Sequence, residues 1–468
     1  MKKIEIALFF IFLTYAAMFL AGVFRPAFLN QVLGAPIQAA RLLAFRTEVR
    51  DEDHPPVYWN PVRDDGIGVV AYDAAKADNG LTLFSSGKGR DVYLIDMQGK
   101  RVHTWTVPYE TIQPVLKGTL PIDRMAALSQ NACESSSPDV LWLPKMVPLQ
   151  DRPPNIGLNI SALHLYPDGS LLVLYMEGGA AYMGGGLAKI DKDSGLLWKY
   201  DGMLTHHDLT VGSDGKIYVL GKIIDPDIPP ASDENQVHSR VHDYVVILSP
   251  EGRELKRVSI LNAFNKLLKE NPHPQTPFER EKFSDDDPFH ANTVELIPME
   301  MDEKYPMVQA GNLLLSFRAL NMLVILNPDT ESLTWASYGP WHRQHSPRLL
   351  KDGSIVLFDN AGNIMNAATS RVLRIDLNTS GILWHYDGEP NRILDSETYS
   401  SVEPLPNGNI LVTETMGGRI FEVTSEKDVV WDYRSVERAK GDFSAPDMAA
   451  ALFAAHRYRV EDLPFLKR

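Results

Sequence analysis

Short apolar runs alternate with polar turns along most of the chain. One recurring unit consists of a short strand pattern, an Asp-Gly or Asn-Gly pair and a strongly apolar strand pattern. This unit occurs at 163–175, 209–221, 347–360 and 402–415. Asp-Gly and Asn-Gly pairs between alternating apolar runs are strong signals for hairpin turns. The pattern therefore predicts antiparallel hairpins through the body of the chain.

A second unit accompanies the first. It has an apolar strand pattern, a polar turn and another strand pattern that often holds tryptophan. Six copies occur, at 92–105, 187–198, 244–256, 323–335, 372–384 and 420–431. Together the two units form a four-stranded repeat of roughly 40–50 residues, the size of a propeller blade. Radial packing of such blades leaves only short, protected edges. We therefore expect an all-β fold, a six-bladed β-propeller formed by residues 61–440.

The two ends of the chain differ from this body. Residues 6–24 carry no charge and follow Lys2 and Lys3. A membrane-spanning helix needs roughly 20 apolar residues, whereas signal-peptide cores have about 7–15. The length favours an uncleaved signal anchor, a transmembrane helix within residues 1–25, over a cleaved signal segment. The early lysines would leave the propeller in the periplasm or outside the cell, attached to the inner (cytoplasmic) membrane by a single pass.

The remaining end segments are a linker and a tail. Residues 26–60 are expected to link the anchor to the propeller. The tail, 441–468, contains the alanine-rich run SAPDMAAALFAAHRY. This composition predicts a helix that packs on one face of the propeller.

Composition excludes several function classes. Asp and Glu total 60 against 46 Lys and Arg, a net charge of −14. This balance argues against non-specific nucleic-acid binding, which needs a basic surface. Cys133 is the only cysteine, so an intrachain disulfide is impossible and a cysteine-based metal site is not expected.

Histidine recurs at one position of the repeat. Eight residues before the turn glycine, two repeats carry His207 and His345, and two others carry Ser161 and Ser400. The repeat with the longer turn places His290 at the same strand start. Equivalent positions of a propeller lie on a ring around its axis, so we expect the three histidines to meet in one site. The remaining candidates, such as His206, show no such register and are expected to be structural or solvent-facing.

A second ring of polar residues follows the same glycines by seven positions. It contains Arg318, Lys222 and Asn360. Arg318 lies between two apolar strands, where a charge needs a partner, and an anionic ligand would be one. The main chemical alternative is a metal held by the three histidines. Arg318 and the lack of a carboxylate at the shared position make a metal less attractive, so none is expected. The acidic run 285–287 is interpreted as a solvated loop.

Four motifs in this order resemble the bacterial arylsulfate sulfotransferase family: HHDL at 206–209, DPFHAN at 287–292, LLLSFR at 313–318 and QHSPRLLKDGSIVLFDN at 344–360. The resemblance implies a six-bladed propeller outside the cytoplasm that moves a sulfuryl group from a phenolic sulfate ester to a phenol, without a nucleotide donor. It implies that His345 is transiently sulfated. It also implies that His207, His290, Asn292 and Arg318 bind the sulfuryl oxygens and assist the leaving group.

The chain departs from the family pattern in two ways. With Cys133 alone it cannot form the disulfide of some relatives, and residues 25–60 are too few for the separate N-terminal β domain of another branch. The chemistry nevertheless fits these side chains, because a neutral imidazole can attack sulfur and form a covalent intermediate. We expect Lys222 and Asn360 to join Asn292 in binding the substrate, and no cofactor to be required.

Two other functions compete with this interpretation. A quinone-cofactor (PQQ-type) dehydrogenase has a similar docking repeat, but in IDKDSGLLW and IDLNTSGILW the Gly-to-Trp spacing is one residue short. A non-catalytic, anchored binding propeller is the other alternative. The expected partners are an aryl sulfate donor, a phenolic acceptor and the membrane, with no nucleic acid. The sequence leaves open whether the protein forms a homodimer.

Overall fold

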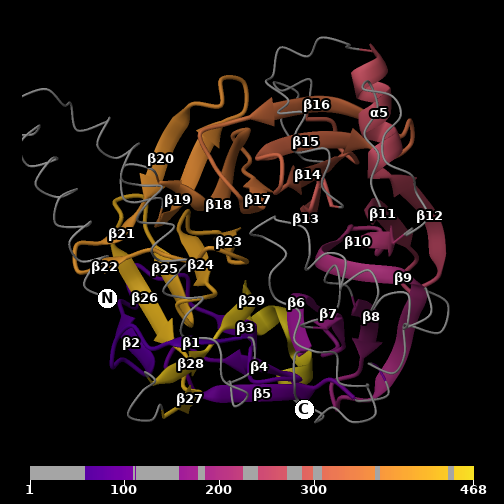
Figure 1. The fold of residues 1–468 in the computed structure, drawn as a ribbon. Helices are drawn as coiled ribbons and strands as arrows, with labels where there is room; N and C mark the ends of the chain where they lie inside the picture. Colours follow the sequence, from indigo (N-terminus) through magenta and orange to yellow (C-terminus); the bar gives the residue numbers. More distant parts are fainter. Residues whose placement is uncertain are drawn as a thin grey trace, which may run out of the picture.

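The computed structural model describes residues 58–108, 111, 158–177, 185–224, 241–270, 287–298, 308–363, 369–440 and 447–467. Most of these residues are in antiparallel strands (Figure 1). Within the described part, no helix is long and apolar enough to span a membrane. The helix predicted for residues 6–24 lies outside it. The all-β prediction is confirmed.

Three smaller sheets, like the seven-stranded sheet described next, contain strands that pair in the order of the chain. Two are four-stranded and one has a fifth strand from the N-terminal region. They are β13 (Ala291–Leu296), β14 (Leu313–Phe317), β15 (Met322–Asn327) and β16 (Ser332–Tyr338); β17 (His345–Leu349), β18 (Ser354–Asn363), β19 (Thr369–Asp376) and β20 (Ile382–Tyr386); and β23 (Ser401–Pro404), β24 (Ile410–Glu414), β25 (Arg419–Val423), β26 (Val429–Arg434) and β2 (Gly68–Tyr72).

A seven-stranded sheet joins two consecutive repeats. Its strands are β6 (Leu158–Leu165), β7 (Leu171–Glu177), β8 (Gly185–Ile190), β9 (Leu196–Val211), β10 (Ile217–Ile224), β11 (Val241–Leu248) and β12 (Glu254–Ser259). Most of the first half of β9 pairs with β8, for example Tyr200 with Leu187. Its second half pairs with β10, for example Leu209 with Val219. The long strand β9 is therefore the outer strand of one repeat and the inner strand of the next.

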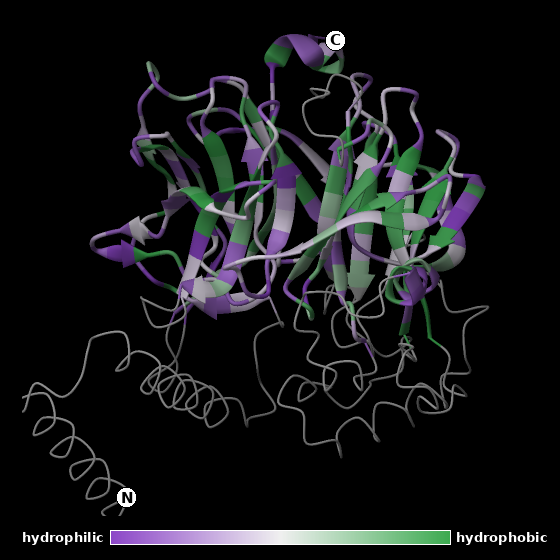
Figure 2. Ribbon diagram, turned by 90° about the horizontal axis from the view of Figure 1, so that it is seen from above, coloured by the Kyte–Doolittle hydropathy of each residue, from purple (hydrophilic) through white to green (hydrophobic). Residues whose placement is uncertain are grey.

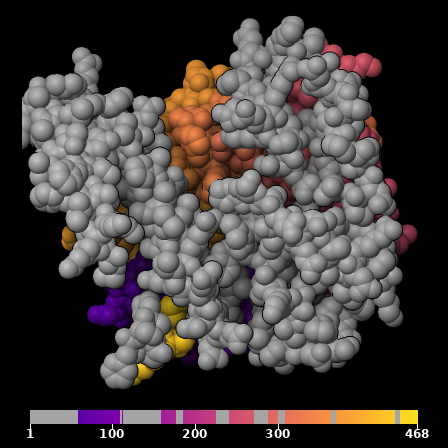
Figure 3. All heavy atoms as spheres, in the orientation of Figure 1, coloured from indigo at the N-terminus to yellow at the C-terminus, as the bar shows by residue number. Residues whose placement is uncertain are grey.

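The sheets lie side by side in a ring. In Figure 1 the strands β6, β13, β17, β23 and β29 lie nearest the centre, and β5, β12, β16 and β20 lie at the periphery. Each inner strand contacts the next, in the order β6, β9, β13, β17, β23, β29 and back to β6. Figure 3, in the same orientation, shows side chains of the β13–β16 and β17–β20 sheets (orange) at the surface of this face.

The turns between inner strands and their neighbours follow the sequence prediction. The turn glycines Gly169, Gly215, Gly353 and Gly408 have φ values of 84°, 78°, 81° and 91°. Each donates its N–H to the carbonyl three residues earlier. Glycine adopts a positive φ without steric cost, which explains the glycine in the Asp-Gly and Asn-Gly pairs.

Apolar side chains fill the spaces between neighbouring sheets, and Figure 2 shows hydrophobic residues (green) concentrated in the strands. One cluster joins β10 and β11 to β13–β15 and to helix α5 (Ile260–Glu270). Within it, the ring of Phe289 lies 5.1 Å from those of Phe264 and Phe317. Burying such a side chain stabilises a fold by about 1.5–3 kcal/mol. This packing fixes the segment that precedes His290.

The prediction of a helical C-terminal tail is wrong. β28 (Met448–Ala450) pairs with β1 (Trp59–Pro61) and β27 (Arg438–Ala439), and β29 (Leu452–Tyr458) pairs with β3 (Leu81–Ser86). β29 thereby becomes the first strand of the sheet that continues through β3, β4 (Asp91–Ile95) and β5 (Arg101–Thr106). Within the described residues, the elements that follow are the short 3-10 helices η6 (Val460–Asp462) and η7 (Pro464–Lys467).

The physical reason lies in tertiary context. Residues 449–455 are all buried, because β29 is packed between β3, β6 and β23. Without β29, β3 would have an unpaired inner edge, so sheet pairing outweighs the helix propensity of alanine. The ring therefore extends to residue 458, beyond the predicted boundary at 440. A two-stranded hairpin, β21 (Gly388–Glu389) and β22 (Arg392–Ile393), lies outside the larger sheets.

Candidate active site

Bulges interrupt the inner strands at the position that the sequence singled out. In β9, the residues His206, His207 and Asp208 lie opposite the single residue Leu220. Similar irregularities occur in β6, β13, β17 and β29. At these points the backbone φ is positive at His207 (59°) and His290 (46°). Non-glycine residues in this region cost about 1–3 kcal/mol and cluster at functional sites, because a bulge re-aims side chains.

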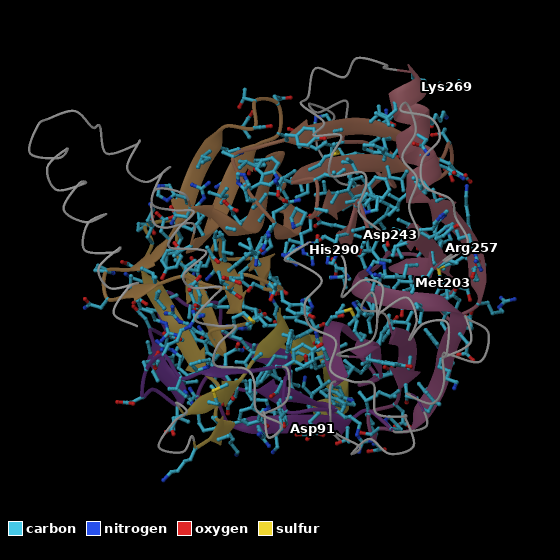
Figure 4. All side chains as sticks on the ribbon, viewed as in Figure 1. Asp91, Met203, Asp243, Arg257, Lys269 and His290 are labelled. Atoms are coloured by element: carbon cyan, nitrogen blue, oxygen red, sulfur yellow. The ribbon has the colours of Figure 1, made fainter. Side chains whose placement is uncertain are left out.

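The three predicted histidines come together. The ring centroids of His207 and His290 are 5.1 Å apart, and His290 lies at the centre of the ring of sheets in Figure 4. Burial lowers the pKa of His207 well below its usual value, and His206, His290, Lys222 and His345 lower it further. These side chains come from three separate repeats, as the shared strand position predicted.

His345 is held by two oxygen atoms. Its Nδ1 lies 2.7 Å from Oδ1 of Asn360 and 3.0 Å from the carbonyl oxygen of Arg343. The orientation of the Asn360 amide is fixed, because its Nδ2 donates to the carbonyls of Ser396 and Tyr399, at 2.7 and 2.9 Å. Since both partners of Nδ1 are acceptors, Nδ1 carries the proton and Nε2 keeps its lone pair.

The environment keeps His345 neutral. Burial and the charge of Arg318 lower its pKa to about 3, although the hydrogen bond to Asn360 acts in the opposite direction. Asn360 is itself almost fully buried. Its amide atoms are engaged with His345 and two carbonyls, so the geometry favours a positioning role over the substrate contact expected from the sequence.

His290 has a carboxylate partner. Its Nδ1 lies 3.0 Å from Oδ2 of Asp287, and its backbone N–H donates to Oδ1 of the same residue at 3.1 Å. Burial would raise the pKa of Asp287, but His290 and Lys222 hold it below its usual value. The prediction that the acidic run is a solvated loop is therefore wrong for Asp287; its neighbours 285 and 286 lie outside the described residues.

His206, which the sequence predicted to be structural or solvent-facing, is buried beside His207. The Nδ1 atoms of the two rings are 2.8 Å apart. On its other side, Nε2 of His206 lies 3.3 Å from Oδ1 of Asp243. His206 and Asp243 are each only 1% exposed. The adjacent histidines of the HHDL motif were the one sequence signal for this contact.

The remaining predicted residues surround these imidazoles. Lys222 is buried in β10, opposite Asp243 in β11. Arg318 directly follows β14, and its charge acts on His345. Nδ2 of Asn292 donates to the backbone carbonyl of Gln344, the residue before His345, at 2.8 Å. Cations and amides therefore border the site on several sides, an arrangement that suits an anionic group.

A cavity of about 70 Å³ lies beside His207 and His345, between the inner strands. Its lining includes His207, His345 and Asn292 together with the aromatic rings of Tyr399 and Phe453. Among the described residues, no group of three or more His, Cys, Asp or Glu side chains is arranged to hold a metal ion.

Comparison with known proteins gives one family match. A sequence model of the family described as Arylsulfotransferase (ASST) matches residues 165–436, more than half of the chain. No curated protein matches the sequence. Among similar solved structures, a Bacteroides caccae protein of unknown function has 13% sequence identity and a TM-score of 0.44, and the match covers 76% of this chain and 94% of that chain. A catalytically inactive Staphylococcus aureus virginiamycin B lyase with quinupristin has 11% identity and a TM-score of 0.34, with coverage of 59% of this chain and 70% of that chain. The WD40 β-propeller domain of Doa1 has 11% identity and a TM-score of 0.39, with coverage of 87% of this chain and 99% of that chain.

Proposed function

The chain belongs to the arylsulfotransferase (ASST) family, and from this premise we propose that it transfers a sulfuryl group from a phenolic sulfate ester to a phenol through a sulfohistidine at His345. The observation that carries the proposal is the orientation of the His345 ring. Two oxygen acceptors bind its Nδ1, which leaves the lone pair of Nε2 for attack on sulfur.

The first half-reaction forms the covalent intermediate. Nε2 of His345 attacks the sulfur atom of the donor, the bond between sulfur and the aryl oxygen breaks, and that oxygen leaves with the electron pair. Its pKa of about 3 keeps His345 neutral at pH 7, so the nucleophile needs no prior deprotonation. The proton on Nδ1 is held by Asn360 while positive charge develops on the ring.

Charge on the sulfuryl oxygens needs donors that are already in place. Arg318 can direct a planar fork at two of these oxygens. Nδ1 of His290 is engaged with Asp287, so Nε2 is the ring atom of His290 that remains for a contact with a third oxygen. Preorganised donors of this kind usually make the largest contribution to catalysis of group transfer.

The second half-reaction regenerates the enzyme. His207 takes the proton of an acceptor phenol, and the phenol oxygen attacks sulfur. The bond between sulfur and Nε2 of His345 breaks, and its electron pair returns to the ring. The proton that His207 takes from the acceptor is the one that it gives to the departing aryl oxygen in the first half-reaction of the next turnover. His207 suits both steps because its ring centroid lies 5.1 Å from that of His290 and because it borders the same cavity as His345.

The proposal extends to the architecture and the cellular location. Six successive inner strands contact one another in a closed cycle, which supports a six-bladed propeller. The uncharged run 6–24 supports a signal anchor that holds the propeller outside the cytoplasm at the inner membrane. Recovery of the intact N-terminus in the membrane fraction would support the anchor, whereas a soluble extracytoplasmic protein with a new N-terminus would contradict it.

Steady-state kinetics test the transfer itself. With a chromogenic aryl sulfate and a phenol acceptor, double-reciprocal plots at several acceptor concentrations should be parallel, because the first phenol leaves before the acceptor reacts. His345→Asn should reduce transfer to background, and His242→Asn, a change in β11 outside the site, should not. Intersecting plots, or an active His345→Asn variant, would contradict the mechanism. Absence of transfer by the wild type with several aryl sulfates would favour a binding propeller.

A further inference from the structure

A chain of buried polar groups extends behind His207. Within the bulge of β9, Nδ1 of His207 lies 2.8 Å from Nδ1 of His206, and the two ring planes are nearly perpendicular, at 88°. Nε2 of His206 lies 3.3 Å from Oδ1 of Asp243. Among the described residues, neither of these two buried atoms makes a hydrogen bond, so the contact between them is an ion-pair distance and not a formed hydrogen bond. The second carboxylate oxygen of Asp243 is occupied, because it accepts the backbone N–H of Ala291 at 3.2 Å.

This geometry determines how protons are distributed. Two Nδ1 atoms at 2.8 Å can share only one proton, so one ring donates and the other accepts. The carboxylate of Asp243 favours a proton on Nε2 of His206. Neutral His206 then presents the lone pair of its Nδ1 to His207, and His207 donates its Nδ1 proton. Nε2 of His207 is left with a lone pair, the form of the ring that accepts a proton from an acceptor phenol.

We propose that His206 and Asp243 are positioning residues that form a proton relay behind His207. The inference rests on the proposed function. When Nε2 of His207 takes the phenol proton, the Nδ1 proton of His207 moves to Nδ1 of His206, and the Nε2 proton of His206 moves toward Oδ1 of Asp243. The relay then holds the proton of the acceptor phenol, and the reverse sequence delivers that proton to the aryl oxygen that departs in the next turnover. Every proton that enters at one ring nitrogen is matched by one that leaves at the other.

The surroundings explain why a relay is needed. Burial, His206, His290, Lys222 and His345 together hold the pKa of His207 well below its usual value. An isolated imidazole in this position would hold a proton poorly. The charged or titratable groups that act on His206 are Lys222 from β10, Asp243 from β11 and Asp287 from the segment before β13. Asp243 contacts His206, which in turn contacts His207. The carboxylate of Asp243 can therefore balance positive charge that arises at His207, on the side away from the substrate.

The relay predicts a dependence on the leaving group. Aryl sulfates with electron-withdrawing substituents release a stable phenoxide and need little protonation, whereas unsubstituted and alkyl-substituted phenols need a proton as they leave. Loss of the relay should therefore slow poor donors more than good ones. A merely structural role for His206 or Asp243 would slow all donors by a similar factor.

Three variants of the full-length protein and a matched control measure this effect. His206→Phe keeps the ring volume and removes both nitrogens, His206→Asn keeps a hydrogen-bonding group beside His207 that cannot pass a proton onward, and Asp243→Asn removes the charge. Each should lower the rate about 100-fold for phenyl sulfate and less than about 10-fold for 4-nitrophenyl sulfate. The plot of log kcat/KM against leaving-group pKa should steepen. His242→Asn should leave its slope unchanged. Equal losses for both donors, or full rescue by His206→Asn, would overturn the relay.

An NMR measurement separates this inference from the proposed function, because it needs no turnover. In protein labelled with ¹⁵N-histidine, the shared proton should give one strongly downfield signal that correlates with Nδ1 of both His206 and His207. His206→Phe and His207→Phe should abolish it, and His242→Asn should retain it. The signal in an enzyme that transfers no sulfuryl group would refute the proposed function and support the coupled imidazole pair. Its absence from the wild type would refute the inference, whatever the activity.

Discussion

Oδ1 of Asn360 lies 2.7 Å from Nδ1 of His345, while Nδ2 of the same amide donates to the carbonyls of Ser396 and Tyr399. Rotation of the amide would point an N–H donor at His345 and leave two carbonyls without their partner. Asn360 therefore selects one tautomer of the imidazole, although it lies behind the ring and on the side away from the reacting nitrogen.

Two substitutions of Asn360 should separate the effect of the His345 tautomer on activity from the effect of a charge beside the ring. Asn360→Ala removes the acceptor, so a fraction of His345 carries its proton on Nε2, and kcat/KM for the donor should fall by about 10²-fold. Asn360→Asp restores an acceptor and adds a negative charge, which raises the pKa of His345. Its activity should exceed that of Asn360→Ala at pH 8 and should decline at a higher pH than the wild type does as the solution is acidified. Identical pH profiles for Asn360→Asp and the wild type would contradict this account.

Arg318→Lys should lower kcat by more than about 10-fold, because a compact ammonium cannot reproduce two parallel hydrogen bonds to sulfuryl oxygens. Arg374→Lys is the matched control, since Arg374 pairs with Asp352 on the exposed side of β19. Stopped-flow release of the first phenol would measure the effect on the first half-reaction alone. An Arg318→Lys variant with the burst rate of the wild type would show that the guanidinium does not act on sulfuryl transfer.

Lowering the pH should destabilise the fold, because His345 binds a proton more readily in the unfolded chain than in the folded protein. Its pKa is 6.5 when unperturbed and falls to about 3 in the folded protein, so between these values the unfolded chain binds one more proton. The free energy of unfolding therefore falls as pH decreases below 6.5, by at most about 2 kcal/mol between pH 7 and pH 5 for this residue. His345→Asn should lose less stability than the wild type over that interval in urea denaturation at the two pH values. An equal loss would contradict the lowered pKa.

Truncations should show that the C-terminal strand completes the ring. Ending the chain after residue 446 removes β28 and β29, exposes the inner edge of β3 and should abolish cooperative thermal unfolding. Ending it after residue 459 removes only η6 and η7. Phe465 packs near Gly169 and Trp105, so this second variant should fold with a lowered melting temperature. A well-folded first variant, judged by circular dichroism and calorimetry, would refute closure by β29.

Local signals in the sequence predicted much of this fold. The Asp-Gly and Asn-Gly turns determine strand register, because each glycine adopts a positive φ that ends one strand and starts the next. Counting back from Gly215 and Gly353 therefore located His207 in the inner-strand half of β9 and His345 at the start of β17. The same counting placed Asn360 beside the site, but it did not predict the hydrogen bond between Asn360 and His345.

Counting from the turns could not predict contacts between strands far apart in the chain. It also could not place residues that lie outside the register of the repeat. Residues 452–458 look helical from their local sequence. Their strand conformation depends on pairing with β3, which lies more than 360 positions earlier in the chain, so local patterns could not predict it. His206 was one residue out of register, and the bulge of β9 brings it back to the site. Asp243 and Asp287 carry no repeat signal, since their roles arise from the packing of β11 and of the segment before β13 against the histidines.

Trapping the sulfohistidine tests the central claim most directly. The protein should be incubated with an aryl sulfate in the absence of an acceptor, quenched and digested at alkaline pH, and analysed by tandem mass spectrometry. The account predicts one added SO₃ group on His345, its loss when a phenol is supplied before quenching, and no added group in His345→Asn. An SO₃ group on another residue, or transfer to phenol at full rate without any covalently modified protein, would contradict it.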